Sequence, residues 1–160
     1  MHVYSEEMIS NVKDQSKAHK NNITECVMKR VAINGLGRIG RLVLREYLNG
    51  EYNDIEIVAV NDLVAIDNLA YLIKFDSVHG RARFEVSVSG NSLKLGDKLI
   101  PVYSEKNPEN LPWKDLGVDV VLEASGAFRK HVEASKHLKA GARRVLISAP
   151  ADDPDKTLVM

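Results

Sequence analysis

Short apolar runs alternate along this chain with amphipathic stretches, and this alternation predicts strands that alternate with helices. The runs are rich in β-branched residues, which is typical of strands buried on both faces in a parallel sheet. The amphipathic stretches carry apolar residues at helical spacing and end at helix-stopping residues such as Asn49-Gly50. We expect strands at residues 30–34, 55–61, 118–123, 144–148 and 156–160, and helices at residues 38–48, 66–75 and 131–140.

Residues 82–104 depart from this pattern. Apolar and polar residues alternate there, and Gly90-Asn91 and Gly96-Asp97 break the alternation into short segments joined by tight turns. This predicts a short antiparallel meander. The strands that alternate with helices elsewhere predict a doubly wound parallel sheet with helices on both faces, so the expected fold class is α/β with the meander as an insertion.

Residues 1–27 are polar, carry scattered charges and show almost no apolar period. A secretory signal needs an apolar core, and a transit peptide is rich in arginine and poor in acids, so the segment fits neither. We expect a disordered N-terminal extension without a role in the fold, because Met28 would be a natural start for the folded protein. The folded domain is therefore expected at residues 28–160.

Three glycines follow the first predicted strand with the spacing Gly-x-Gly-x-x-Gly. Gly35 permits a tight turn off the strand, Gly37 lets a pyrophosphate approach the backbone, and Gly40 lets the next helix pack closely on its strand. The free N–H groups at the start of that helix would then face the anion. By itself the pattern is a weak signal, and the residues around it decide its meaning.

An acidic residue stands where this type of site needs one. Asp62 follows the second predicted strand, 22 residues after Gly40, and the separation expected in dinucleotide-binding folds is about 20 residues. A carboxylate there can accept hydrogen bonds from both hydroxyls of an adenosine ribose and would repel a 2′-phosphate, which favours NAD over NADP. The strand, turn, helix and acid together predict a Rossmann-type domain with NAD as its cofactor. A glycine turn without a ligand is the alternative.

Composition narrows the partners of such a domain. The chain has 160 residues with 22 basic and 22 acidic side chains, so its balanced charge gives no reason to expect a nucleic acid or an anionic membrane as partner. No apolar run is long enough to span a bilayer. The only cysteine, Cys26, excludes an internal disulfide and suits a reducing compartment, so we expect a cytoplasmic protein.

The sequence offers no catalytic group to use this cofactor. None of the five histidines has a cysteine or acidic partner at metal-ligand spacing, so we expect no metal site. Cys26 lies in the polar extension, and a catalytic thiol needs an ordered base beside it. Ser125 and Gly126 end a predicted strand at the edge where open α/β sheets bind ligands, but a plain turn fits them as well. Two interpretations fit Arg38, Arg41 and Lys106 equally well: a side chain that contacts the ligand, or a side chain exposed to solvent.

Six segments of the chain, in family order, closely resemble the N-terminal NAD-binding domain of the glyceraldehyde-3-phosphate dehydrogenases. The resemblance covers residues 28–160 and leaves out the extension. The segments are Val-Ala-Ile-Asn-Gly-Leu-Gly-Arg-Ile-Gly-Arg, Val-Ala-Val-Asn-Asp-Leu, Lys-Phe-Asp-Ser-Val-His-Gly, Asn-Pro-Glu-Asn-Leu-Pro-Trp, Gly-Val-Asp-Val-Val-Leu-Glu-Ala-Ser-Gly and Val-Leu-Ile-Ser-Ala-Pro.

The resemblance implies roles for individual residues. Arg38 and Ile39 would contact the pyrophosphate through the helix start, and Asp62 would hold the adenosine ribose. Lys106 matches a position near the adenine, and the turn at Ser125 and Gly126 matches one beside the nicotinamide ribose. Leu36 stands where the family commonly has phenylalanine, a change we expect to be tolerated. The expected cofactor residues are Asn34, Gly35, Leu36, Gly37, Arg38, Ile39, Gly40, Asn61, Asp62, Lys106, Ser125 and Gly126.

The resemblance also implies what the chain lacks. The family's nucleophilic cysteine lies in a Ser-Cys-Thr-Thr-Asn segment that does not occur here, and its catalytic histidine follows in a second domain. The full enzyme, a homotetramer, would oxidise glyceraldehyde 3-phosphate through a thioester and pass hydride to NAD. We expect this chain to be truncated before the catalytic domain and to bind NAD without catalysis. The alternatives are the same domain of an erythrose-4-phosphate dehydrogenase, or a non-enzymatic nucleotide-binding or interaction fragment.

Overall fold

The structure is a computed structural model that describes residues 2–5, 28–152 and 154–157. Its helices are α1 (Arg38–Asn49), α2 (Ile66–Lys74), α3 (His131–Lys139) and the short 3-10 helix η2 (Pro108–Asn110). Its strands are β1 (His2–Ser5), β2 (Lys29–Asn34), β3 (Ile55–Asn61), β4 (Phe75–Asp76), β5 (Gly80–Arg81), β6 (Val86–Ser89), β7 (Ser92–Leu95), β8 (Lys98–Tyr103), β9 (Val120–Glu123), β10 (Arg144–Ile147) and β11 (Lys156–Thr157).

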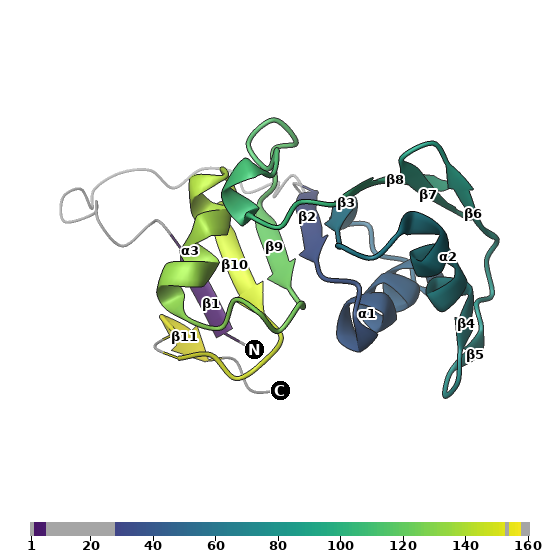
Figure 1. The fold of residues 1–160 in the computed structure, drawn as a ribbon, viewed down its shortest axis with the longest axis horizontal. Coiled ribbons are helices and arrows are strands. Elements are labelled where there is room, and N and C mark those ends of the chain that lie inside the picture. The colour runs from purple at the N-terminus through teal and green to yellow at the C-terminus, as the bar shows by residue number, and fades with distance from the viewer. Residues whose placement is uncertain (1, 6–27, 153, 158–160) are drawn as a thin grey trace, which may run out of the picture.

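Within the described residues, nine of these strands form one sheet in the order β11-β1-β10-β9-β2-β3-β8-β7-β6 (Figure 1). The neighbours β8, β3, β2, β9 and β10 are parallel. Numbered along the chain from β2, they lie in the order 3-2-1-4-5, which is the order of a doubly wound dinucleotide-binding sheet. The predicted Rossmann-type α/β fold is thus confirmed, and its topological switch point lies between β2 and β9.

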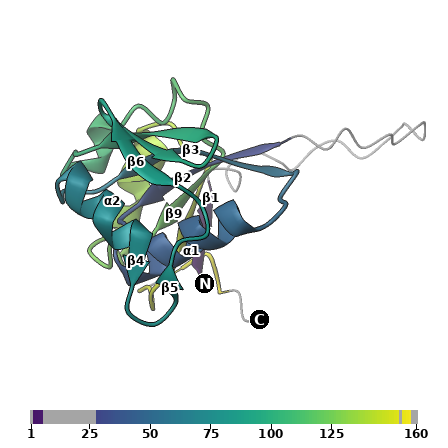
Figure 2. The ribbon, with the colours of Figure 1, turned by 90° about the vertical axis from the view of Figure 1, so that its right-hand side faces the viewer.

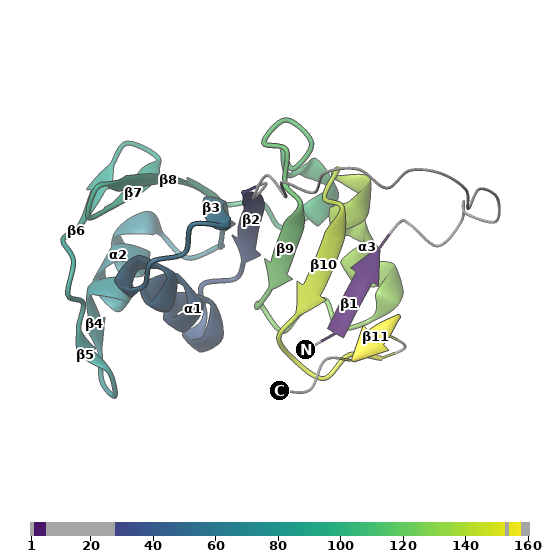
Figure 3. The same cartoon turned by 180° about the vertical axis from the view of Figure 1, so that it is seen from behind.

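Both faces of the sheet are covered by apolar side chains from other elements. Alternate residues of each central strand point to opposite faces, so each face has its own apolar core. On β2, Ile33 packs with Leu44 of α1, whereas its neighbour Ala32 packs with Trp113 on the other face. Helix α3 packs on β10 through Ala134, and it lies in front of β10 and β1 in Figure 1 and behind them in Figure 3. No helix of the described chain has the length and apolar character needed to cross a membrane.

Helix α1 packs tightly against β2 because Gly40 has no side chain. A Cβ placed on Gly40 would lie 2.0 Å from the carbonyl oxygen of Gly35 and 3.4 Å from Cγ2 of Ile33. The first of these distances is far below a van der Waals contact, so any side chain would push the helix away from its strand. The predicted role of Gly40 in helix packing is confirmed.

Helix α2 ends one residue earlier than predicted, because the chain enters the hairpin β4–β5 at Phe75. The sequence did not predict this hairpin, whose strands are too short to show an alternating pattern. The buried guanidinium of Arg45 donates to the carbonyl of Ile73 at 3.1 Å and to that of Gly80 at 3.0 Å. Arg45 therefore joins α1 to the end of α2 and to the hairpin.

The hairpin turn is closed by Asp76. Its carboxylate accepts hydrogen bonds from the backbone N–H groups of His79 at 2.8 Å and Val78 at 2.9 Å. These bonds, with a smaller contribution from the His79 ring, hold the pKa of Asp76 well below its usual range. The turn therefore keeps its charged acceptor through the whole range of mildly acidic and neutral pH.

The meander β6–β7–β8 is continuous with the parallel sheet. Strand β7 pairs antiparallel with β6 and β8, as predicted, and β8 also pairs in parallel with β3. Figure 2 views the molecule from this side, with β6 and the hairpin β4–β5 toward the viewer. The expected insertion therefore supplies the third parallel strand of the fold as its last segment. Its first strand begins at Val86, four residues after the start of the predicted meander region.

The N-terminal segment differs from our expectation. His2–Ser5 form β1, which pairs antiparallel with β10 and β11, so these residues belong to the sheet rather than to an extension outside the fold. The outer backbone groups of β10 need partners, and any extended segment can supply them whatever its side chains. The rest of the expected extension, residues 6–27 with Cys26, lies outside the described residues, as do residues 158–160 of the last predicted strand.

We predict that Gly40→Ala lowers the free energy of unfolding by about 1–3 kcal/mol, the usual range for overpacking. Urea unfolding followed by the fluorescence of the single tryptophan, Trp113, measures this change. Gly37→Ala is the matched control, because a Cβ on Gly37 would meet only the carbonyl oxygen of Ala124, at 3.9 Å. We expect its effect to stay below about 1 kcal/mol. Equal destabilisation by both substitutions would contradict the packing role of Gly40.

Candidate cofactor site

Three neighbouring strands end on polar residues at the switch point. Asn34, Asn61 and Glu123 are the last residues of β2, β3 and β9, and the strand register places Asn34 between the other two. A cavity of about 810 Å³ opens at this edge, a volume typical of small-molecule sites. Open α/β sheets bind ligands at this place, outside the carboxyl ends of their strands.

The cavity brings together residues that lie far apart in the sequence. Of the expected cofactor residues, it is lined by Asn34, Gly35, Gly37, Asn61, Asp62, Lys106 and Ser125. The sequence did not single out the other lining residues, which are Leu63, Glu105, Asn107, Glu109, Ala127, Phe128 and Lys136. Glu105 lies just after β8, so the rule that strand ends meet at one edge could have identified it.

The glycine turn runs close against the turn that follows β9. Gly35 has a φ of 95°, and a Cβ there would lie 2.5 Å from both Cα and N of Ser125. Its predicted role in a tight turn is confirmed, since only glycine combines this backbone conformation with this close approach. The side chain of Leu36 points into the core, where it is 1% exposed. The Arg41 guanidinium donates to the Leu36 carbonyl at 2.8 Å and holds the turn from the helix side.

Gly37 shows the opposite behaviour to Gly35. It precedes α1 with a φ of −64°, which other residues also adopt. A Cβ on Gly37 would be in van der Waals contact with the Ala124 carbonyl oxygen alone. The protein's own packing therefore does not require glycine at this position. A Cβ on Gly37 would instead occupy open space at the start of the helix, beside its first N–H groups. Arg38 and Ile39 lie exposed in this first turn.

Asp62 lines the same cavity as Gly37 and contacts the glycine turn. Its Oδ2 accepts a hydrogen bond from the backbone N–H of Leu36 at 2.6 Å, and its Oδ1 accepts one from Val64 at 2.9 Å. Each carboxylate oxygen can accept about two hydrogen bonds, so the side chain has acceptor capacity left for ligand hydroxyls. Asp62 therefore holds the turn and can still bind a ribose.

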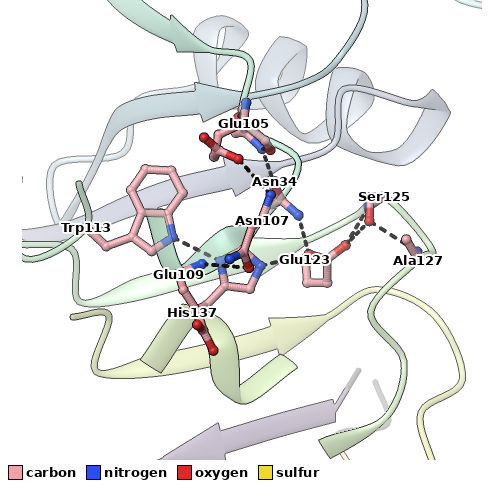
Figure 4. A network of polar contacts seen from close by, with 10 residues as sticks. Asn34, Glu105, Asn107, Glu109, Trp113, Glu123, Ser125, Ala127 and His137 are labelled. Carbon is pink, nitrogen blue, oxygen red and sulfur yellow. Dashed lines mark hydrogen bonds and ion pairs between the residues drawn. The ribbon is translucent and has the colours of Figure 1, made fainter. Parts of the chain in front are cut away.

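A row of hydrogen bonds crosses the floor of the cavity (Figure 4). The backbone of Glu105 exchanges two hydrogen bonds with the Asn61 side chain, at 2.8 and 2.9 Å. The Asn61 amide donates to Asn34 Oδ1 at 2.7 Å, and the Asn34 amide donates to Glu123 Oε2 at 2.5 Å. The ends of β3, β2 and β9 are thereby connected side chain to side chain, and the segment after β8 is joined to them through its backbone.

The row continues beneath the cavity into the core. His137 of α3, which is fully buried, contacts Glu123 Oε2 through Nε2 at 3.0 Å, and Trp113 donates its indole N–H to His137 Nδ1 at 3.0 Å. Tryptophan can only donate, so Nδ1 is the acceptor and the ring proton lies on Nε2, directed at the carboxylate. The other oxygen of Glu123 accepts from the backbone N–H of Ser125 at 2.8 Å and from its hydroxyl.

The remaining expected residues have no direct part in the cavity wall. Gly126 is exposed in the turn after β9, with a φ of 75°. Gly40 serves helix packing. Among the described residues, no thiol or imidazole lines the cavity. In the part of the chain that the structure describes, no group of three or more histidine, cysteine, aspartate or glutamate residues could hold a metal ion.

Comparison with known proteins agrees with this geometry. Residues 29–131 match the family described as "Glyceraldehyde 3-phosphate dehydrogenase, NAD binding domain". The glyceraldehyde-3-phosphate dehydrogenase of Geobacillus stearothermophilus is 55% identical over 131 residues, which are 82% of this chain and 38% of the relative. The enzymes of the same name from Chlamydia pneumoniae and Thermotoga maritima are 53% identical over 131 residues and 51% identical over 133 residues.

These two alignments cover 82% and 83% of this chain, and 39% and 40% of the relatives. The chain therefore spans about two fifths of the length of the curated relatives it matches. The matched part is the part that binds the cofactor, and the cofactor of this domain is NAD. The fold, the glycine turn and the family match lead to one conclusion: the chain belongs to the glyceraldehyde-3-phosphate dehydrogenase family and is its NAD-binding domain.

Proposed function

We propose that this chain binds NAD in the cavity at the carboxyl ends of β2, β3 and β9. The observation that carries the proposal is the open space at Gly37. The glycine is not required by the fold, yet it stands at the start of α1, in the same cavity as the Asp62 carboxylate. An anion seated against bare helical N–H groups, with a ribose held by a carboxylate, is the arrangement that a dinucleotide needs.

The start of α1 receives the pyrophosphate in this proposal. The first N–H groups of a helix have no partner within it, and the helix dipole adds a partial positive charge there. Gly37, Arg38 and Ile39 contribute backbone groups, and the absent Cβ of Gly37 allows the phosphate to come close. Gly35 and Gly40 act indirectly, because they shape the turn and seat the helix.

Asp62 selects the nucleotide in this proposal. Its free acceptor positions bind the two hydroxyls of the adenosine ribose, while its negative charge disfavours the 2′-phosphate of NADP. Lys106, at the same edge of the cavity, flanks the adenine side. Asn34 and Asn61 form the floor, and the turn at Ser125 and Gly126 faces the nicotinamide half.

NAD, once bound, supplies the hydride acceptor of an aldehyde oxidation. The described residues that line the cavity bind and orient it, and none of them is a thiol or an imidazole that could act as a nucleophile or a base. We therefore propose that the 160-residue chain binds NAD but does not turn over an aldehyde by itself. In a protein that also contained a counterpart of the rest of these relatives, this domain would bind NAD for the oxidation of glyceraldehyde 3-phosphate in glycolysis.

The setting of the protein is part of the same proposal. A single cysteine among 160 residues suits a reducing compartment, and we place the protein in the cytoplasm. A homotetramer of the full-length protein, which the family resemblance implies, belongs to the same proposal.

We predict that Gly37→Ala weakens NAD binding by about tenfold or more, since one methyl group would stand where the pyrophosphate approaches. Isothermal titration calorimetry measures the dissociation constant. The urea unfolding of the same variant serves as control, because a folded protein that has lost affinity separates a blocked site from a broken fold. Unchanged affinity would remove Gly37 from the site.

We predict that Asp62→Ala weakens NAD binding and lowers the preference for NAD over NADP by about tenfold, because the charged acceptor and its repulsion of a 2′-phosphate are both lost. The ratio of the two dissociation constants is the decisive measurement, since loosening of the glycine turn would affect both nucleotides alike. Asp97→Ala, at an aspartate in the turn between β7 and β8, is the matched control. An unaltered ratio would show that Asp62 does not read the ribose.

We predict that the purified 160-residue chain forms no NADH from glyceraldehyde 3-phosphate, phosphate and NAD. The full-length Geobacillus stearothermophilus relative, assayed in parallel, is the positive control. Turnover above the background without protein would contradict the proposal that this chain only binds the cofactor. Loss of NAD binding would instead favour the non-enzymatic interaction fragment.

A further inference from the structure

Glu123 is a buried acidic residue to which neither the family match nor the proposed function gives a role. Its side chain is fully buried, and among the described residues no lysine or arginine forms an ion pair with it. We infer that Glu123 is a positioning residue, whose carboxylate fixes the Ser125 turn and the Asn34 amide and thereby sets the shape of the NAD cavity. This inference rests on the proposed function.

The hydrogen bonds around Glu123 account for all of its acceptor capacity. Oε1 accepts from the N–H and the hydroxyl of Ser125, and Oε2 accepts from the Asn34 amide and from His137 Nε2. An ionised carboxylate offers about four acceptor positions, and four donors surround this one. A buried charge without a cation is stable only when it is hydrogen-bonded in this complete way.

One arm of this arrangement orders the turn after β9. Ser125 is exposed, although its backbone lies close against Gly35. The carboxylate binds both its N–H and its hydroxyl, and the hydroxyl oxygen in turn accepts from the N–H of Ala127 at 3.1 Å. Ser125 and Ala127 both line the cavity. The wall of the cavity on this side therefore takes its conformation from a side chain beneath it.

A second group of hydrogen bonds connects Glu123 to the side-chain amides in the floor of the cavity. Because Glu123 accepts from Asn34 Nδ2, the Asn34 oxygen faces Asn61 and accepts from its amide. The Asn61 amide also donates to the Glu105 carbonyl, and its oxygen accepts from the Glu105 N–H. Reversing any one amide would place donor against donor or acceptor against acceptor along the row. The Glu105 backbone at one end and the Glu123 carboxylate at the other thus require the same orientation of both amides.

A third arm holds the carboxylate itself. Trp113 occupies His137 Nδ1, so the imidazole can offer only Nε2–H to Glu123. His137 does not line the cavity, and its ring is fully buried between α3 and the sheet. The orientation of Glu123 is therefore set from the core side, independently of any ligand.

These arms predict which bond the variant Glu123→Gln would lose. The two donors at Oε2 are fixed, one by Trp113 through His137 and the other by the amide row, so the oxygen of the new side-chain amide would remain there. The NH₂ group of that amide would then face the N–H of Ser125, and two donors cannot pair. Glu123→Gln should therefore release the Ser125 turn selectively.

The test compares NAD dissociation constants of the 160-residue chain by calorimetry. Glu123→Gln is expected to weaken NAD by about tenfold. Glu56→Gln makes the same chemical change in β3, where Glu56 pairs with Arg30 away from the cavity, and should leave the affinity within about twofold. In the double variant with Ser125→Ala, the loss should not exceed that of the weaker-binding single variant by more than about twofold, because both act on one turn. Additive losses, or equal affinities of the native chain and Glu123→Gln, would overturn the inference.

Hydrogen exchange of the Ser125 amide gives a readout that requires no NAD. We expect this amide to be protected in the native chain without ligand and to exchange at least about tenfold faster in Glu123→Gln. Unprotected exchange in the native chain would overturn the inference even if Glu123→Gln failed to fold. If the native chain bound no NAD while the amide behaved as expected, the proposed function would fail and the positioning of the turn would stand.

His137 provides a second pair of variants. His137→Leu removes the donor to Glu123 and should weaken NAD severalfold, whereas His137→Gln keeps one donor and one acceptor and should restore most of the affinity. A merely structural role would lower the stability of both variants and leave the affinity of the folded protein unchanged, and that result would count against Glu123 as a positioning residue.

Discussion

The structure depends on one close backbone approach, between Gly35 and Ser125 at the switch point of the sheet. A Cβ on Gly35 would lie 2.5 Å from two backbone atoms of Ser125, so the turns after β2 and β9 can meet only because that atom is missing. The two turns touch at this edge of the sheet. Beyond them the chain continues to α1 on one face and to α3 on the other. Gly35 and Ser125 both line the cavity that opens at this contact, as do Asn34 and Asn61 at the ends of their strands.

Much of this arrangement could be predicted from the sequence because its determinants are local. The three glycines, the acid at Asp62 and the alternation of strands and helices each leave a mark within a short stretch of chain. The two-residue strands of the hairpin β4–β5 leave none. Strand β1 was missed for a different reason, since its pairing with β10 uses backbone groups that every residue carries.

The polar network was beyond the reach of sequence reasoning, because its spacing carries no signal. The sequence indicates only that Glu123 ends a predicted strand and that His137 has no acidic partner close to it along the chain. They meet across 14 residues, and Trp113 reaches His137 across 24. The strand register alone brings Asn34, between Asn61 and Glu123, into this row. Such a network is stable only when complete, so it also disfavours any other register of β2 and β9.

The hydrogen bond from the Leu36 N–H to Asp62 has a consequence for how a ligand arrives. It holds the glycine turn in the free protein, so the loop need not become ordered during binding. The entropy cost of ordering this loop is therefore part of the free energy of folding and does not reduce the free energy of binding. We expect a ligand to associate with such a preformed turn in a single step, with an observed rate that rises in proportion to ligand concentration and reaches no plateau set by a slow rearrangement of the protein.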